Sequence, residues 1–180
     1  MDPTTALEVA RAFKDDTEQM FFLYRDTIAA LRAYHQTYAG IDRGTFMEYR
    51  VGDHAVAPST VGEFRDRSAR DGPHEARLAN LALVTLYEIW EHRRRDELAA
   101  ALSLVREEVK ISALGDLRLF RNAILHPAGE ARADLAKCEI MRWFQPGDPV
   151  RFGPPEVEEI CGRVGSGIDE FVVTRLRTAT

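Results

Sequence analysis

Apolar side chains recur at helical spacing over long stretches of this chain, and no stretch shows convincing strand-like alternation. The first pattern begins at Asp2-Pro3, a favoured pair for a helix cap and first turn, and Gly40 predicts its end. The second begins near His74 and contains LANLALVTLYEIW, which is apolar almost all round. A helix of this kind lies at the centre of a core or is shared between a core and a subunit interface. Together these patterns predict an all-α protein.

Further patterns complete the set of expected helices. The second helix turns charged at EHRRRDE and is expected to continue through LAAALSLVREEV. A third helix, with Ser112 as its cap, carries ALGDLRLFRNAILH, and a shorter helix is expected around AGEARADLAKCEIMRWF. The last helix starts at GPPEVEE, and its apolar stripe consists of Val157, Ile160, Cys161, Val164, Ile168, Phe171 and Val172. Gly162, Gly165 and Gly167 weaken that helix locally. The chain is therefore predicted to be an antiparallel up-and-down helical bundle.

The length of 180 residues fits a single domain spanning 1–180, and 45% hydrophobic residues suffice for a substantial core. Residues 41–73 lack sustained periodicity and contain several glycines and two prolines. We interpret them as an irregular insertion between the first two long helices, with a short helix or a hairpin inside it.

Composition and charge limit the cellular compartment and the binding partners that we expect for this chain. The N-terminus has no basic segment followed by an apolar run, and the most apolar stretch is too short for a membrane and contains Asn80 and Glu88. Cys138 and Cys161 fit no zinc or disulfide spacing, so we expect reduced thiols in a cytoplasmic protein. The net charge of −5 excludes nucleic-acid binding through bulk positive charge. Any RNA contact must therefore come from a local patch, for which the arginine-rich composition is suited.

The stretch LRLFRNAILHPAG, residues 117–129, carries the candidate site. On a helical wheel Arg121 falls in the middle of an apolar arc formed by Leu114, Leu117, Phe120, Ile124 and Leu125. A guanidinium there must be paired, reach outward or face a cleft. Asn122 and His126 are four residues apart and share the edge of the arc, while Pro127 is expected to distort the helix end at His126.

A purely structural interpretation explains the same residues. Arginine on a bundle helix is often half of an ion pair, and Glu91 on the preceding long helix is the expected partner of Arg121. Histidine at a helix end often interacts with the last carbonyl groups and the helix dipole, which would account for His126.

The arrangement RNAILH, an arginine, a polar residue, spacers and a histidine, resembles the motif of the HEPN superfamily of small helical ribonucleases and toxins. The resemblance extends over roughly residues 80–150, because LYEIWEHRRRDELA, GDLRLFRNAILHPAG and KCEIMRWFQPGD follow one another as in bacterial HEPN-like proteins. It implies an endoribonuclease that needs neither metal nor cofactor and uses Arg121, Asn122 and His126 as catalytic residues. The 2′-hydroxyl of RNA would attack the adjacent phosphate, with histidine transferring protons and arginine stabilising the transition state.

The resemblance also implies an assembly and a biological setting. One histidine cannot serve easily as both acid and base, so a homodimer with a composite active site is expected, with the apolar segment Leu81–Trp90 beside it. Members of the superfamily act as toxins or effectors in bacterial toxin–antitoxin and anti-phage systems, which implies an antitoxin or defence-system partner protein.

Other residues receive supporting roles. Glu91 has the spacing of a helix-surface ion pair with Arg94 or Arg95. In a functional interpretation Glu91 orients Arg121, while Arg94, Arg95 and Arg118 guide RNA. A second function, of another class, also fits the sequence. In this alternative the same bundle is a non-catalytic dimerisation or interaction module, which the net acidity and the apolar segment Leu81–Trp90 favour.

Overall fold

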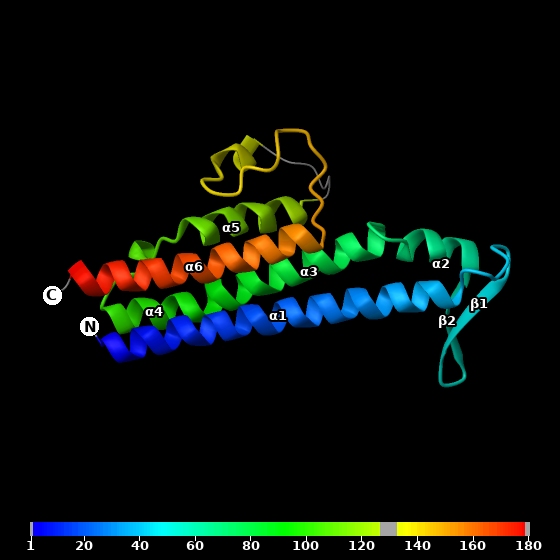
Figure 1. Cartoon of the computed structure of the whole chain (residues 1–180), viewed down its shortest axis with the longest axis horizontal. Coiled ribbons are helices and arrows are strands. Elements are labelled where there is room, and N and C mark those ends of the chain that lie inside the picture. The colour runs from blue at the N-terminus through cyan, green and yellow to red at the C-terminus, as the bar shows by residue number, and fades with distance from the viewer. Residues whose placement is uncertain (1, 127–132, 179–180) are drawn as a thin grey trace.

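A computed structural model describes residues 2–126 and 133–178 and confirms an all-α helical bundle. Four long helical segments run up, down, up and down, as Figure 1 shows: α1 (Pro3–Thr37), α3 (Pro73–Ile89) continued by α4 (Arg95–Leu102), α5 (Ser112–Ile124) and α6 (Pro154–Thr178). In the bundle α1 contacts α3, α4 and α6, while α5 packs against α3 and α6. Both ends of the described chain lie at the same end of the bundle.

The predicted start of the first helix is confirmed. The Asp2 carboxylate accepts hydrogen bonds from the backbone N–H groups of Thr4 and Thr5, and Pro3 occupies the first turn, where its missing N–H costs nothing. The buried face of α1 follows helical spacing through Ala6, Val9, Ala10, Phe13, Thr17, Tyr24 and Ile28. Burial of this face against the other helices stabilises a helix of this length.

The second long helix does not run as far as predicted. A π-helical turn, η1 (Trp90–Arg94), interrupts it, and it ends at Leu102 because Ser103 adopts a left-handed conformation with φ of 55°. The short 3₁₀ turn η2 (Arg106–Glu108) then leads to α5. Trp90 is buried and packs against Phe13, with ring centroids 5.1 Å apart, so it is a core residue.

The apolar stripe predicted for the last helix is largely confirmed. Val157, Ile160, Val164, Ile168 and Val172 are buried, whereas Cys161 and Phe171 are half-buried at the margin. One glycine of this helix has a packing role, because a Cβ atom at Gly167 would come within 3.0 Å of the Ile111 side chain. Ser112 is the first residue of α5 rather than its cap, and its hydroxyl donates to Glu139 instead.

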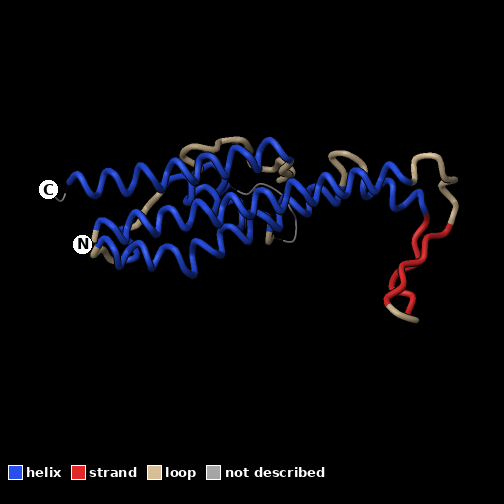
Figure 2. The backbone as a smooth tube through the Cα atoms, turned by 60° about the horizontal axis from the view of Figure 1, so that its bottom comes forward, coloured by secondary structure: helices blue, strands red, loops and turns tan. Residues whose placement is uncertain are grey.

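The predicted insertion contains both a hairpin and a short helix, at the end of an arm. Strands β1 (Phe46–Val51) and β2 (His54–Thr60) pair antiparallel, and α2 (Val61–Ser68) follows with a capping box between Thr60 and Glu63. Figure 2 shows that α1 and α3 extend beyond the bundle as a two-helix arm, with the hairpin projecting from its tip. Sequence alternation did not indicate these strands.

A buried ion pair joins the two helices of the arm. Arg32 of α1 donates from Nε and Nη2 to the two carboxylate oxygens of Glu75 on α3, at 2.6 and 2.7 Å. The Glu75 side chain is only 2% exposed, and these hydrogen bonds hold the pKa of its carboxyl group below the ordinary value of 4.5. The pair therefore holds α1 and α3 together within the arm.

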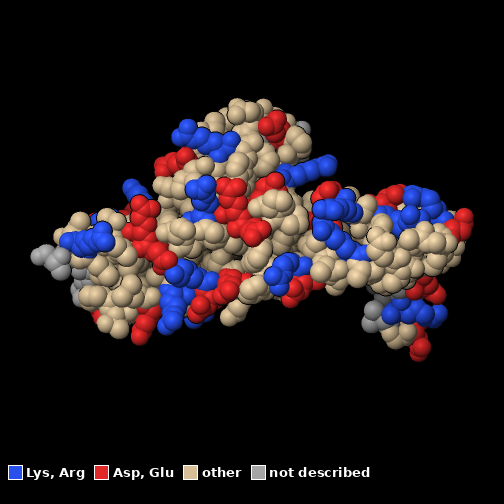
Figure 3. Space-filling model, viewed as in Figure 1, with Lys and Arg blue, Asp and Glu red and all other residues tan. Residues whose placement is uncertain are grey.

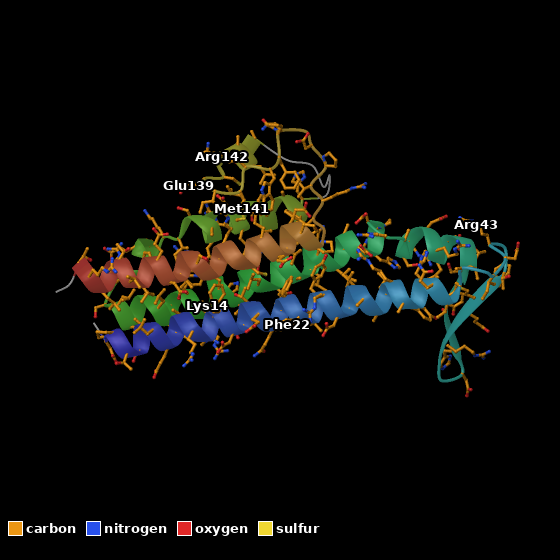
Figure 4. All side chains as sticks on the ribbon, in the orientation of Figure 1. Lys14, Phe22, Arg43, Glu139, Met141 and Arg142 are labelled. Atoms are coloured by element: carbon orange, nitrogen blue, oxygen red, sulfur yellow. The ribbon has the colours of Figure 1, made fainter. Side chains whose placement is uncertain are left out.

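A long segment between α5 and α6 covers the outer face of α5. Among the described residues of this segment, only Ala133–Lys137 is helical, as the 3₁₀ turn η3. The short helix predicted across residues 128–144 is therefore wrong for its described part. Asp116, 1% exposed, accepts hydrogen bonds from the backbone N–H groups of Glu139, Ile140 and Met141, each at 2.8 Å. Figure 4 labels Glu139 and Met141 on this segment, above α5. Asp116 thus anchors the segment to α5.

The face shown in Figure 3 carries arginine and lysine interspersed with aspartate and glutamate, and no single basic patch dominates it. This distribution agrees with the net charge of −5. Among the residues that the structure describes, no helix is long and apolar enough to cross a membrane.

Candidate catalytic site

Arg121 lies near the C-terminal end of α5 and is paired with Glu88 of α3. Its Nε and Nη2 groups donate to Oε1 of Glu88, at 3.1 and 3.0 Å. The two side chains are 34% and 35% exposed, so the pair sits at the edge of the bundle rather than in its core. Leu125, expected on the apolar arc, is 54% exposed, which makes the buried arc narrower than the wheel predicted.

The prediction that Glu91 pairs with Arg121 is wrong. Glu91 forms ion pairs with Arg95 and Arg106 instead, at 3.2 and 2.9 Å. Glu88 and Glu91 already point about 60° apart on a regular helix, and the π-helical turn that begins at Trp90 changes the rotation between them further. Only the tertiary position of α5 selects which of the two carboxylates meets Arg121.

The second oxygen of the same carboxylate contacts a histidine. Nε2 of His92 lies 2.9 Å from Oε2 of Glu88, so Glu88 stands between Arg121 and His92. Sequence reasoning assigned no role to either residue in the site. The signal was present in the spacing, because Glu88 and His92 are four residues apart on one helix and such pairs meet.

On the other side of Arg121 lie the remaining motif residues. Arg121 Nη1 donates to Oδ1 of Asn122 at 3.2 Å. Arg121, Asn122 and His126 line one hollow of about 320 Å³, together with Leu119, Ala123, Leu125, Asp134 and Leu135. The structure thus brings the three predicted catalytic residues to one place at the end of α5. The predicted effect of Pro127 lies outside the described residues.

The arginine retains hydrogen-bonding capacity. A guanidinium has five N–H donors, and the contacts with Glu88 and Asn122 engage three of them within the described part of the chain. The other two lie on Nη1 and Nη2, the pair of nitrogens that binds phosphate oxygens in a fork. The described contacts therefore hold Arg121 in place and leave it N–H donors with which it can bind an anion.

None of the three supporting arginines, Arg94, Arg95 and Arg118, lines this hollow. Arg94 is 10% exposed and bridges Asp16 on α1, at 2.7 Å, and Glu97, at 2.8 Å, which places it between helices instead of on a surface for RNA. Arg95 and Arg118 line a separate cleft of about 440 Å³, which also contains Glu91, Lys110 and Lys137. Leu119 lines both the cleft and the hollow, so α5 separates them.

Within residues 2–126 and 133–178, no group of three or more histidine, cysteine, aspartate or glutamate side chains could hold a metal ion. The arrangement at the hollow can instead bind an anion through Arg121 and offers imidazole for proton transfer.

Comparison of the chain with protein-family models, with curated proteins and with solved structures found no match.

Proposed function

We propose that this protein is an endoribonuclease that cleaves RNA by attack of the 2′-hydroxyl on the adjacent phosphate, without a metal ion. The observation that supports the proposal is the convergence of Arg121, Asn122 and His126 on one hollow, with two N–H donors of Arg121 open to a phosphate. The resemblance of RNAILH, which contains the same three residues, to the HEPN motif also supports it.

Each residue has a distinct task in this proposal. Arg121 binds the non-bridging oxygens and stabilises the charge that grows on them in the transition state. Asn122 orients the guanidinium through its side-chain oxygen, 3.2 Å from Nη1. His126 transfers a proton at the reacting phosphate. The product carries a 2′,3′-cyclic phosphate, and the other fragment carries a 5′-hydroxyl group.

The biological setting follows from the resemblance alone. We propose a toxin or effector of a bacterial toxin–antitoxin or anti-phage system, acting on RNA in the cytoplasm and controlled by an antitoxin or defence-system partner protein.

We keep a homodimer in the proposal but revise its interface. Five of the ten residues of Leu81–Trp90 are buried within one chain, which reduces the area that this segment can supply. An open apolar groove lies nearby between α1 and α3, lined by Thr27, Ala30, Leu31, Tyr34, His74, Arg77 and Leu78. Leu23 and Leu81, both 63% exposed, continue this groove at helical spacing along α1 and α3. Leu81 lies two turns from Glu88 on one face of α3. A second copy seated there would lie beside the candidate site.

RNA cleavage in the presence of a metal chelator tests the proposal. Wild-type protein should cut a pool of bacterial RNA and leave 2′,3′-cyclic phosphate ends, whereas Arg121→Ala and His126→Ala should be inactive and retain wild-type circular dichroism. The matched controls are Arg163→Ala and His54→Ala, which replace exposed residues far along the sequence from the motif. Tightly controlled expression should show the same ranking in growth inhibition. Full activity of both motif variants would refute the assignment.

Analytical ultracentrifugation of wild type and Leu78→Glu tests the assembly. We expect a dimer for the wild type and a monomer for the variant, because the added carboxylate would be buried at the interface. A wild-type monomer that cleaves RNA would exclude the dimer.

The groove also favours the second candidate function, a non-catalytic interaction module. That function predicts that Leu78→Glu abolishes binding of a specific protein partner, while His126→Ala behaves as wild type in every assay.

A further inference from the structure

A cleft of about 440 Å³ lies where several parts of the chain meet: the end of α3, the turn η1 with the start of α4, the first turns of α5, and the segment over α5. It is distinct from the hollow at Arg121, because Leu119 is the one lining residue that the two share. A volume of this order suits a small-molecule ligand, for which sites of roughly 300–1,000 Å³ are typical.

The π-helical turn η1 forms one wall of this cleft. Trp90 and Glu91 of the turn line it, and so does Arg95, the residue that follows the turn. A π-helical turn is rare and occurs often at functional sites, where the wider turn changes the directions that side chains have on a regular helix. The helix thus departs from α-helical geometry at the residues that face the cleft.

Charged side chains of both signs line the cleft. Four are cationic and three are anionic: Arg95, Lys110, Arg118 and Lys137, and Glu91, Asp116 and Glu139. All three carboxylates already have partners in the fold. Glu91 pairs with two arginines, Asp116 accepts three backbone N–H hydrogen bonds, and Glu139 accepts a hydrogen bond from a serine hydroxyl.

The cations are satisfied less completely than the carboxylates. Lys110 and Arg118 are exposed, and neither forms an ion pair with any residue that the structure describes. Arg95 donates to Glu91 through Nη1, but its buried Nε has no partner in the same part of the chain. A buried donor without an acceptor is unfavourable. The cleft therefore offers two unpaired positive charges and favours an anion.

Apolar side chains form most of the remaining lining: Tyr87, Trp90, Val109, Ile111, Leu114 and Leu119. The two aromatic rings are 7% and 3% exposed, so they lie at the base of the cleft, beneath its charged side chains. A ligand that fills this cleft therefore needs an apolar part as well as a charged group.

We propose that this cleft binds a small phosphate monoester with an apolar or aromatic body. The phosphate of a monoester carries a charge of about −1.5 to −2 at pH 7, which matches the two charges of Lys110 and Arg118. The Arg118 guanidinium also suits phosphate oxygens in a fork. A carboxylate, or one phosphodiester group of RNA, carries a single charge and leaves one cation unmatched. The proposal does not depend on ribonuclease activity, because Arg121 is not part of the cleft.

Isothermal titration calorimetry with phenyl phosphate tests the site. Benzoate, which has the ring and a single charge, should bind at least about tenfold more weakly, because it loses a charged contact. Phenol lacks the charge and inorganic phosphate lacks the ring, so both should also bind more weakly than phenyl phosphate. Equal affinity for benzoate and phenyl phosphate would overturn the charge match, and failure of phenyl phosphate to bind would overturn the site.

Substitutions locate the binding of phenyl phosphate. Arg118→Gln and Lys110→Gln should each weaken it about tenfold, since each removes one charged contact. Because both residues are exposed, the variants should keep the circular dichroism and melting temperature of the wild type. Arg163→Gln, at an exposed arginine of α6, is the matched control and should bind as wild type. Arg121→Gln should also bind as wild type; loss of binding there, with Arg118→Gln unaffected, would place the ligand in the hollow and overturn the proposal.

Competition distinguishes the sources of a phosphate monoester. The competitors are two short 2′-O-methyl RNA strands, which lack the attacking hydroxyl group, one with a 5′-hydroxyl and one with a 5′-phosphate. Displacement of phenyl phosphate by neither strand supports a small-molecule ligand, and displacement by the 5′-phosphate strand alone supports a monoester at an RNA end. Equal displacement by both strands would show that the cleft binds the RNA backbone, and would overturn the proposal.

Discussion

Arg121 and Glu88 are joined across the interface of α5 and α3 by two hydrogen bonds to a single carboxylate oxygen, at 3.1 and 3.0 Å. Both side chains are about one-third exposed. An ion pair in such a position contributes about 0–1 kcal/mol to stability, because water already solvates both charges well. Its main consequence is geometric: it fixes the Nε–Nη2 edge of the guanidinium of Arg121, which lines the hollow.

Glu88→Gln should therefore separate stability from activity. We expect the free energy of unfolding to change by less than about 1 kcal/mol. RNA cleavage should fall about tenfold or more, since Arg121 loses the charge that orients it. Urea denaturation and initial cleavage rates measure the two effects. Glu91→Gln is the matched control on the same helix and should retain activity; equal loss in both variants would show that general acidity of this face is what matters.

Arg121→Lys preserves the charge but not the fork. A lysine ammonium cannot contact Glu88 and Asn122 while presenting two parallel N–H groups to a phosphate. The expected loss in kcat/KM is about 10²-fold, comparable to removal of one transition-state donor. Steady-state cleavage of a fixed RNA substrate measures it, with circular dichroism as the control for folding. Wild-type activity in Arg121→Lys would mean that charge alone suffices.

Acidification should weaken the arm through Glu75. Hydrogen bonds from Arg32 lower the pKa of the Glu75 carboxyl group in the folded protein, relative to 4.5. This stabilisation is fully present above pH 4.5 and is lost as the pH falls through the lowered folded value. At pH 7, Glu75→Gln should cost about 2–3 kcal/mol, less than for a fully buried pair because Arg32 is 35% exposed.

Urea denaturation at pH 7 and below pH 4 tests this account of Glu75. The difference between wild type and Glu75→Gln should shrink at the lower pH. A difference that stays constant would show that the pair is not what the variant removes.

Asp116→Asn should loosen the segment over α5. The carboxylate accepts three backbone N–H hydrogen bonds at 2.8 Å each, and an amide can replace it only in part because its NH₂ group is a donor. We expect a loss of about 2–3 kcal/mol. Hydrogen exchange should accelerate at the amides of Glu139, Ile140 and Met141, with those of α1 as the internal control. Unchanged protection at these three amides would contradict the anchoring role.

Both cysteines should resist alkylation in the folded protein. Burial raises the pKa of the Cys138 thiol to about 12, with Asp116 adding to the effect, and burial likewise raises the pKa of Cys161 to about 12. At pH 8 only about one thiol in ten thousand is then the reactive thiolate. Iodoacetamide should label neither residue until urea unfolds the chain, as mass spectrometry would show. Rapid labelling of native protein would contradict this burial.

Helical spacing was sufficient to predict the four long segments and the buried stripe of α6, because burial of one face imposes a period of 3.6 residues. Helical spacing did not predict the elements that lack such a buried helical face. The hairpin at the tip of the arm shows no alternation of polar and apolar residues in its sequence. The segment over α5 is held by Asp116 through backbone N–H groups, which nearly every residue has, so its sequence carries no signal.

The sequence by itself determined which residue types are available at the candidate site: Arg121, Asn122 and His126 are set on one helix end by their spacing alone. Tertiary structure decided their partners. Glu88 rather than Glu91 meets Arg121 because the packing of α5 on α3 and the π-helical turn at Trp90–Arg94 fix which carboxylate faces the guanidinium. His92 meets the other oxygen of that carboxylate through local spacing instead, because the two residues are four apart along one helix. Contacts between residues 33 positions apart depend on how two helices are rotated against each other, and local spacing does not encode that rotation.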